Sequence, residues 1–159
     1  MDLLPFFQWC EASPIGEAIR ESRWLFPVIE SVHLLGLVVI AASVLVVDMR
    51  LFGVGLRDEP VARLARNMQP WLIVSLVVML TTGTLLFLSE AIKCYYSPAF
   101  WIKISCLGVV IIYTFTIRQH VVMSSEARLR PETSKMVAVV SVLLWAGVGW
   151  GGRWIGFGG

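Results

Sequence analysis

Four long apolar runs dominate the chain, at about residues 25–47, 71–88, 100–117 and 136–155, and polar and charged residues gather between them. A helix needs about 20 apolar residues to cross the hydrocarbon core of a bilayer, so each run suits one span. Helices joined by short connections pack as antiparallel neighbours. The pattern predicts an all-α fold, an integral membrane up-down four-helix bundle that forms a single membrane domain over residues 1–159.

The first 23 residues follow a different pattern, in which aromatic residues at 6–9 are followed by charged residues between 11 and 23. Pro5 and Pro14 suit the first turns of short helices. We expect an amphipathic segment over residues 1–23 that lies in the membrane interface, with its aromatic side chains inward; a partly ordered leader is the alternative. A cleavable signal peptide is not expected, because no Lys or Arg precedes Arg20. A second surface helix is expected to start at Pro60, and Pro70 is expected to open the second span.

Composition and charge narrow the class of protein. The chain is 57% hydrophobic and only 15% charged, whereas about 25% of residues are charged in a typical soluble domain. The net charge of +2 and the lack of a basic run with aromatic residues argue against nucleic acid as a partner. Eight of the 13 Lys and Arg residues fall in the first and third connections. The positive-inside rule therefore places both termini on the extracytoplasmic side.

The first span holds the most unusual polar residues. Glu30 and His33 lie one helical turn apart, on one face, where an ionisable side chain is costly and marks a candidate functional site. Counting 1.5 Å per residue from the middle of each span sets the depth of other polar residues. The count predicts a polar pocket in the outer half of the bundle, built from Glu30, His33, Thr82, Glu90, Lys103 and Cys106.

A purely structural interpretation competes with this pocket. In it, Glu30 pairs with Lys103, and His33 forms a hydrogen bond with a neighbouring Ser or Thr, which only fixes the register of the helices. His120 is about 20 Å from His33 along the membrane normal, among polar residues at the cytoplasmic edge. We therefore expect His120 to be solvated, and it cannot be a second axial ligand to a haem that His33 binds.

Three functions fit these residues. The first is a ligand-binding or electron-transfer bundle that holds haem b or a copper ion, with His33 as ligand, Cys106 or Met79 as a second soft ligand, and Lys103 or Arg23 beside haem propionates. Its candidate cofactor-binding residues are His33, Glu30, Met79, Thr82 and Lys103, and its candidate metal ligands are His33 and Cys106. The second is a transporter or proton relay along Glu30, His33, Asp48 and Glu90. The third is an accessory subunit, without a cofactor, of a larger membrane complex.

Enzymatic activity is left open, although hydrolysis is not expected. The chain has no nucleophile elbow, no phosphate-binding loop and no His-pair zinc motif. It has one Glu-x-x-His, whereas di-iron bundles need two such motifs.

Two further patterns concern covalent links and packing. Cys10 and Cys94 fall on the same predicted side, where they either form a disulfide or stay two separate thiols. The small residues of Gly147-x-x-x-Gly151 allow helices to approach closely, either inside the bundle or between copies in a homo-oligomer.

Several strings together resemble a family of small uncharacterised bacterial inner-membrane proteins with four transmembrane helices. They are ESVHLLGL at 30–37, VDMRLFG at 47–53, TGTLLF at 82–87, FWIK at 100–103 and GRWIGF at 152–157. The resemblance implies a multi-pass protein of the bacterial plasma membrane, and no activity. HLLG in a first span is also similar to copper-resistance D-type proteins and b-type cytochromes, in which histidines pair at matching depths.

Overall fold

The structure, a computed structural model, describes residues 3–55, 58–123 and 131–157. All of its regular elements in these ranges are helical, which confirms the all-α prediction. In chain order they are α1 (Leu4–Glu11), α2 (Pro14–Glu21), α3 (Leu25–Phe52), α4 (Val61–Ser89), α5 (Ala91–Tyr96), α6 (Pro98–Tyr113), the π-helical turn η1 (Thr114–Arg118), α7 (Gln119–Met123) and α8 (Pro131–Phe157).

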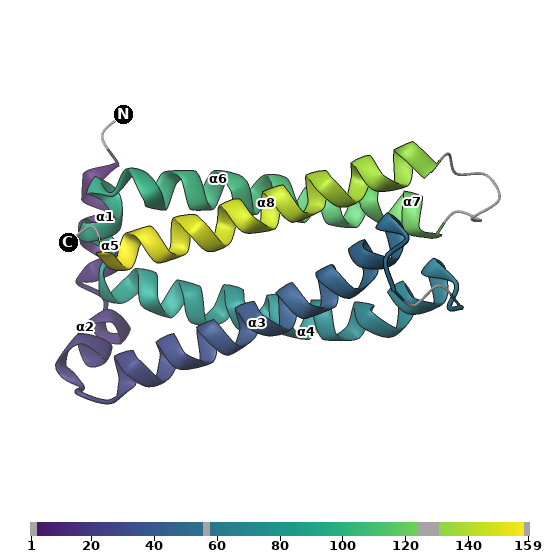
Figure 1. Cartoon of the computed structure of the whole chain (residues 1–159). Coiled ribbons are helices and arrows are strands. Elements are labelled where there is room, and N and C mark those ends of the chain that lie inside the picture. The colour runs from purple at the N-terminus through teal and green to yellow at the C-terminus, as the bar shows by residue number, and fades with distance from the viewer. Residues whose placement is uncertain (1–2, 56–57, 124–130, 158–159) are drawn as a thin grey trace.

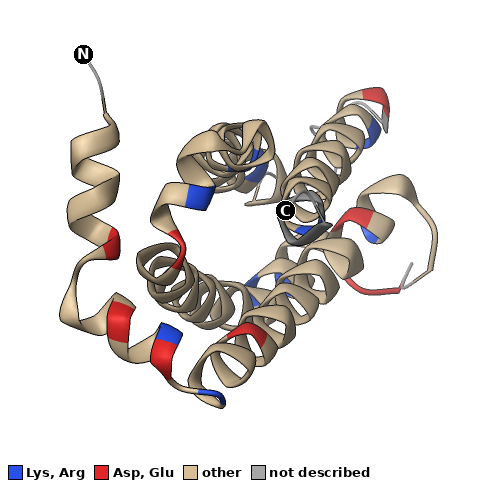
Figure 2. Ribbon diagram, turned by 90° about the vertical axis from the view of Figure 1, so that its left-hand side faces the viewer, with Lys and Arg blue, Asp and Glu red and all other residues tan. Residues whose placement is uncertain are grey.

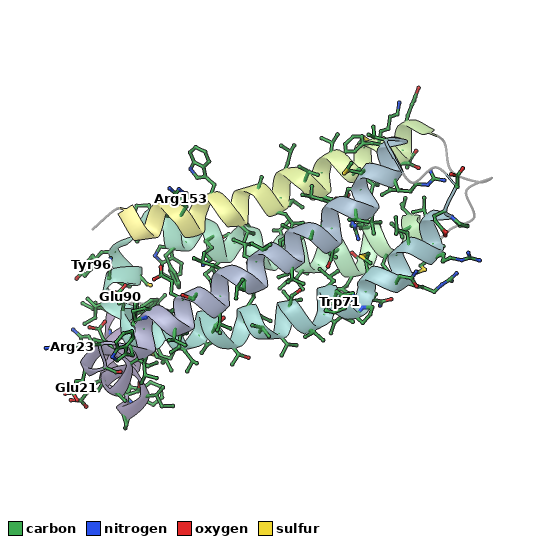
Figure 3. All side chains as sticks on the ribbon, turned by 60° about the horizontal axis from the view of Figure 1, so that its bottom comes forward. Glu21, Arg23, Trp71, Glu90, Tyr96 and Arg153 are labelled. Atoms are coloured by element: carbon green, nitrogen blue, oxygen red, sulfur yellow. The ribbon has the colours of Figure 1, made fainter. Side chains whose placement is uncertain are left out.

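Four long rods run side by side, alternately up and down, and both chain ends lie at the same end of the bundle (Figure 1). The stretches Leu25–Phe52, Val61–Ser89, Pro98–Met123 and Glu132–Arg153 are each long and apolar enough to cross a membrane. Exposed Trp71 and Tyr96 lie toward opposite ends (Figure 3), where amphipathic aromatic rings favour the headgroup level. The chain is therefore a membrane protein built on a four-helix bundle.

The long helices associate as two pairs. α3 packs along α4 and α6 packs along α8, and α3 against α8 joins the pairs, whereas α4 and α6 do not pack closely along their length. Seen along the bundle, α1 and α2 lie at one end of the long helices, along the side formed by α5, α4 and α3 (Figure 2). We call this the α5 end, because α5 lies there, and the other the α7 end.

The helix boundaries correct two sequence-based expectations. α3 does not end at residue 47 but continues to Phe52, and Gly53 with φ of +80° closes it. The predicted surface helix and second span are one helix, α4, which continues through Pro70. The missing amide hydrogen bond at Pro70 is tolerated because Val61 and Ala65 are buried in the core at the α7 end, with Leu51 and Val121, and hold the first turns of α4 in place.

The N-terminal segment is held against the bundle by hydrogen bonds and aromatic contacts, which a segment that only lies in the membrane interface would not need. The Glu11 carboxylate accepts a hydrogen bond from the amide of Ile92 at 2.6 Å, at the start of α5. Arg20 donates to the carbonyl of Ser89 at 3.0 Å, at the end of α4. Phe7 is buried against the rings of Phe87, Tyr95, Phe100 and Trp101. Both α1 and α2 thus cap the junction between α4 and α5.

Candidate functional site

A cavity of about 270 Å³ lies between α3, α4 and α6, on the side where α4 and α6 leave the bundle open. Its polar lining residues are His33, Thr84 and Lys103. The others are apolar: Leu76, Met79, Leu80, Gly83, Phe87, Phe100, Ile104 and Leu107. The cavity is thus a largely hydrocarbon-lined space into which α3 and α6 each bring one basic side chain.

The His33 imidazole is held by α4. Its Nδ1 lies 2.9 Å from the Thr82 hydroxyl oxygen. That hydroxyl donates its own proton to the carbonyl of Val78 at 2.7 Å, so its oxygen accepts the bond from His33. Nδ1 therefore carries the ring hydrogen, and the lone pair of Nε2 is available to a ligand. Gly83 makes room for the ring, because an added Cβ there would lie 3.2 Å from His33 Cε1.

Lys103 reaches the same cavity from α6. It is half-buried, interacts electrostatically with His33, and lies against α8, where a Cβ added at Gly152 would be 3.5 Å from its Nζ. In the described part of the chain, no carboxylate forms an ion pair with Lys103. A lysine inside a span without a partner costs about 2.5–3.5 kcal/mol, so this amine is a favourable site for an anionic group.

The structure brings together four of the five residues predicted to bind a cofactor. His33, Met79 and Lys103 line the cavity, and Thr82 orients His33. Glu30 is exposed and lies outside the cavity lining, and no ion pair joins it to Lys103. The hydrogen bond from His33 to Thr82 is the contact that the structural interpretation expected, and it is compatible with ligand binding because it uses only one ring nitrogen.

The remaining predicted site residues lie elsewhere. Cys106 packs toward Gly147 of α8, with its Sγ 3.6 Å from where a Cβ would stand, and it is absent from the cavity lining. Glu90 forms a partly exposed ion pair with Lys93 at 3.6 Å. His120 is exposed, as expected. Among the described residues, no three His, Cys, Asp or Glu side chains are grouped so that they could hold a metal ion.

Asp48 forms a contact that the sequence did not reveal. The Arg118 guanidinium donates to Asp48 Oδ1 through Nη2 at 2.9 Å and Nε at 3.1 Å, and Nη2 also approaches the carbonyl of Val44 at 3.3 Å. Both side chains are buried. Arg118 is one of the eight basic residues that the sequence analysis counted in the first and third connections, because it follows the third apolar run. The sequence does carry one signal for this contact: Arg118 directly follows the third apolar run, as Asp48 directly follows the first, and both positions fall toward the α7 end.

An apolar layer separates this ion pair from the cavity. Asp48 lies 15 residues beyond His33 on α3, about 22 Å along the helix axis. Buried apolar side chains fill the bundle between these levels: Ile40, Val44, Leu76, Val110, Trp145 and Val148. A proton relay from Glu30 and His33 to Asp48 would have to cross this layer.

The two cysteines that were considered for a disulfide lie in one buried cluster at the α5 end. Cys10 of α1 and Cys94 of α5 pack there with Phe7 and Ala91, and both are free thiols. Burial raises the pKa of the Cys94 thiol to about 11, and the charge of Glu90 raises it further in the same direction. Burial also raises the pKa of Cys10.

Comparison with known proteins gives a family and no function. Residues 6–158 match the family of unknown function DUF6644, and the chain belongs to this family. No curated protein and no solved structure matches the chain.

Proposed function

We propose that the protein is a membrane-embedded binding protein whose cavity between α4 and α6 takes a small amphipathic anion. One observation carries the proposal: His33 and Lys103 line one largely apolar cavity, and no acidic residue in the described ranges forms an ion pair with either of them. Ligand sites in proteins are mostly apolar with a few polar groups that fix orientation. The apolar lining suits a hydrocarbon body, and the Lys103 amine suits a carboxylate at its end.

The chemistry of each basic group narrows the ligand further. The Lys103 amine donates charge-assisted hydrogen bonds to an anionic oxygen. His33 Nε2 accepts a hydrogen bond, for example from a hydroxyl next to that oxygen. A volume of about 270 Å³ lies near the lower end of the range for ligand pockets, about 300–1,000 Å³, which favours a slender molecule. The ligand class is a single-chain apolar acid, bound with its head in the half of the membrane nearer the α5 end.

The matched variants Lys103→Met and Lys93→Met test this proposal. Both remove one lysine charge, but Lys93 is at the surface, paired with Glu90, and outside the cavity lining. The protein in nanodiscs is titrated with a fluorescent fatty acid. A hydrogen bond to a charged group contributes about 1.5–3 kcal/mol, so Lys103→Met is expected to weaken binding by about 10- to 100-fold, and Lys93→Met to leave it unchanged. Equal affinities in the two variants would refute the role of Lys103.

Haem b is the second candidate: the cavity volume favours a slender molecule over this broad macrocycle, but the orientation of His33 favours haem. Axial histidines donate their other ring N–H to a second residue, as His33 does to Thr82, and Lys103 is placed to neutralise a propionate. Bound haem would supply one-electron chemistry. Copper has less support, because of its two predicted soft ligands only Met79 shares the cavity with His33.

An absorption spectrum of the purified protein, oxidised and then reduced, together with elemental analysis, tests the cofactor. For haem we expect a Soret band that His33→Ala abolishes and that the control His120→Ala retains. A featureless spectrum with no bound iron or copper, from cells supplied with both, rejects haem and copper and leaves the apolar acid as the ligand.

We also propose that the α5 end faces the extracytoplasmic side of a bacterial plasma membrane. The connections at the α7 end carry most of the Lys and Arg residues, which favours the cytoplasm for that end. Cysteine labelling in intact cells tests this. A membrane-impermeant maleimide should label a cysteine introduced at exposed Tyr96 and not one at exposed Asp58.

A further inference from the structure

The Asp48–Arg118 pair lies among buried polar atoms that have no hydrogen-bond partner. Asp48 and Ser141 are 0% exposed and Thr114 is 2% exposed. Three side-chain oxygens of these residues have no partner: Asp48 Oδ2, Ser141 Oγ and Thr114 Oγ1. Among the described residues, the other buried side-chain atom without a partner is Trp145 Nε1, one helical turn after Ser141 on α8. Buried polar atoms without a partner are rare in folded proteins, so three in one region indicate a missing hydrogen-bonding molecule.

The three oxygens come from the helices that meet at this level. Both Arg118 hydrogen bonds to the carboxylate end on Asp48 Oδ1, which leaves Oδ2 without a donor. The Ser141 side chain of α8 lies beside the same carboxylate, but its hydroxyl makes no hydrogen bond of ordinary geometry. Thr114 is one helical turn before Arg118 and so lies on the same face of α6 and η1. α3, η1 and α8 pack together here.

We infer that an ordered water molecule binds between Asp48 Oδ2, Ser141 and Thr114. Arg118 already neutralises the carboxylate, so the site does not call for a cation. A carboxylate oxygen can only accept, whereas each hydroxyl can donate or accept. Water donates to Oδ2 and completes its bonding at the two hydroxyls. Three polar partners are the usual number for a buried water. The water thus links α3, η1 and α8 about the ion pair, separately from the His33 cavity.

Removing single hydroxyls tests the water through the sign of the change in stability. Thr114→Val and Ser141→Ala each delete one partner of the water. We expect the Tm of the full chain in detergent to fall by about 2–4 °C in each. If the site is dry, each change instead removes an unsatisfied buried hydroxyl and the Tm rises, which overturns the inference. The control Thr116→Val deletes an exposed hydroxyl that bonds to the carbonyl of Ile112, and its Tm should stay close to that of the parent.

The double variant and a direct observation complete the test. Because both hydroxyls act through one water, Thr114→Val with Ser141→Ala should lower the Tm by less than the sum of the two single changes. Additive losses would contradict a shared water. An experimental density map of the unmodified protein at about 2 Å should show a peak between the three oxygens, and a map without one overturns the inference even if the variants fail to fold.

Discussion

Arg118→Met tests whether the ion pair is a main support of the bundle. At the 2.9 Å separation and an effective dielectric constant of about 20, the two charges attract each other by about 6 kcal/mol. Replacing Arg118 removes this attraction and leaves the Asp48 carboxylate buried without a counter-charge. Breaking one side of a buried pair typically costs about 3–5 kcal/mol, and we expect a loss of that size in the free energy of unfolding.

Asp48→Leu combined with Arg118→Met separates the cost of an orphaned charge from the net value of the pair. Two apolar side chains of similar volume need no counter-charge, and such replacements are often neutral or stabilising. The double variant should therefore regain most of the stability that Arg118→Met loses. Equilibrium unfolding in mixed micelles with increasing SDS, followed by tryptophan fluorescence, measures all three proteins.

Arg63→Met is the matched control for this experiment. Arg63 pairs with Glu59 at 3.6 Å, but both side chains are about half exposed or more, at 65% and 48%. Exposed pairs are screened by water, so its loss should cost about 0–1 kcal/mol. If Arg118→Met is no more destabilising than Arg63→Met, the buried pair does not support the bundle and the reasoning is refuted.

Two further predictions concern the α5 end. A Cβ at Gly16 would clash with the backbone carbonyl of Leu88, so Gly16→Ala should displace α2 from α4 and speed proteolysis in residues 14–24, whereas Gly149→Ala, which meets no atom within 4 Å, should not. Unchanged proteolysis in Gly16→Ala would show that α2 is not held this closely. With a pKa of about 11, Cys94 in a Cys10→Ser, Cys106→Ser background should react with iodoacetamide at pH 8.5 about 100-fold more slowly when folded than in SDS. Because the folded chain holds the Cys94 proton more tightly than the unfolded chain, the stability that this thiol contributes is intact below about pH 8.5 and declines as pH rises toward 11. Equal alkylation rates in the folded protein and in SDS would contradict the burial of Cys94.

The sequence predicted the spans well because bilayer thickness fixes how long an apolar helix must be. The sequence-based prediction was wrong at the helix ends, because bilayer thickness does not determine how far a helix extends beyond the membrane. Asp48 was interpreted as part of an exit from the membrane, yet it is buried because Arg118, 70 residues later, supplies its counter-charge. A local pattern cannot show a partner that far along the chain. Pro70 was interpreted as a helix start for the same reason, since burial of Val61 and Ala65 outweighs its local preference.

The sequence predicted the depth of the candidate-site residues in the membrane but not which way each side chain points. Counting residues placed His33, Thr82 and Lys103 at compatible levels, and the structure brings them together. Glu30 lies at a similar depth, but it is not on the face of α3 that lines the cavity. The buried stripe of α3 runs through Ile40 and Gly36 to His33, and its extension by one turn falls on half-buried Ile29, which turns Glu30 outward. Which face of a helix meets which neighbour depends on packing across the bundle.

The two ends of the bundle differ in a way that sets the route to the cavity. At the α7 end, the ion pair and a buried apolar cluster fix the helices to one another. At the α5 end, the rings of Phe87 and Phe100 line the cavity and stack at 5.6 Å, which forms a contact between α4 and α6.

Phe7 packs on both of these rings, so α1 covers that end of the cavity against the aqueous phase. The open side between α4 and α6 faces the bilayer. A ligand that is itself dissolved in the membrane can therefore reach Lys103 without passing through water. This route matches the apolar acid proposed above.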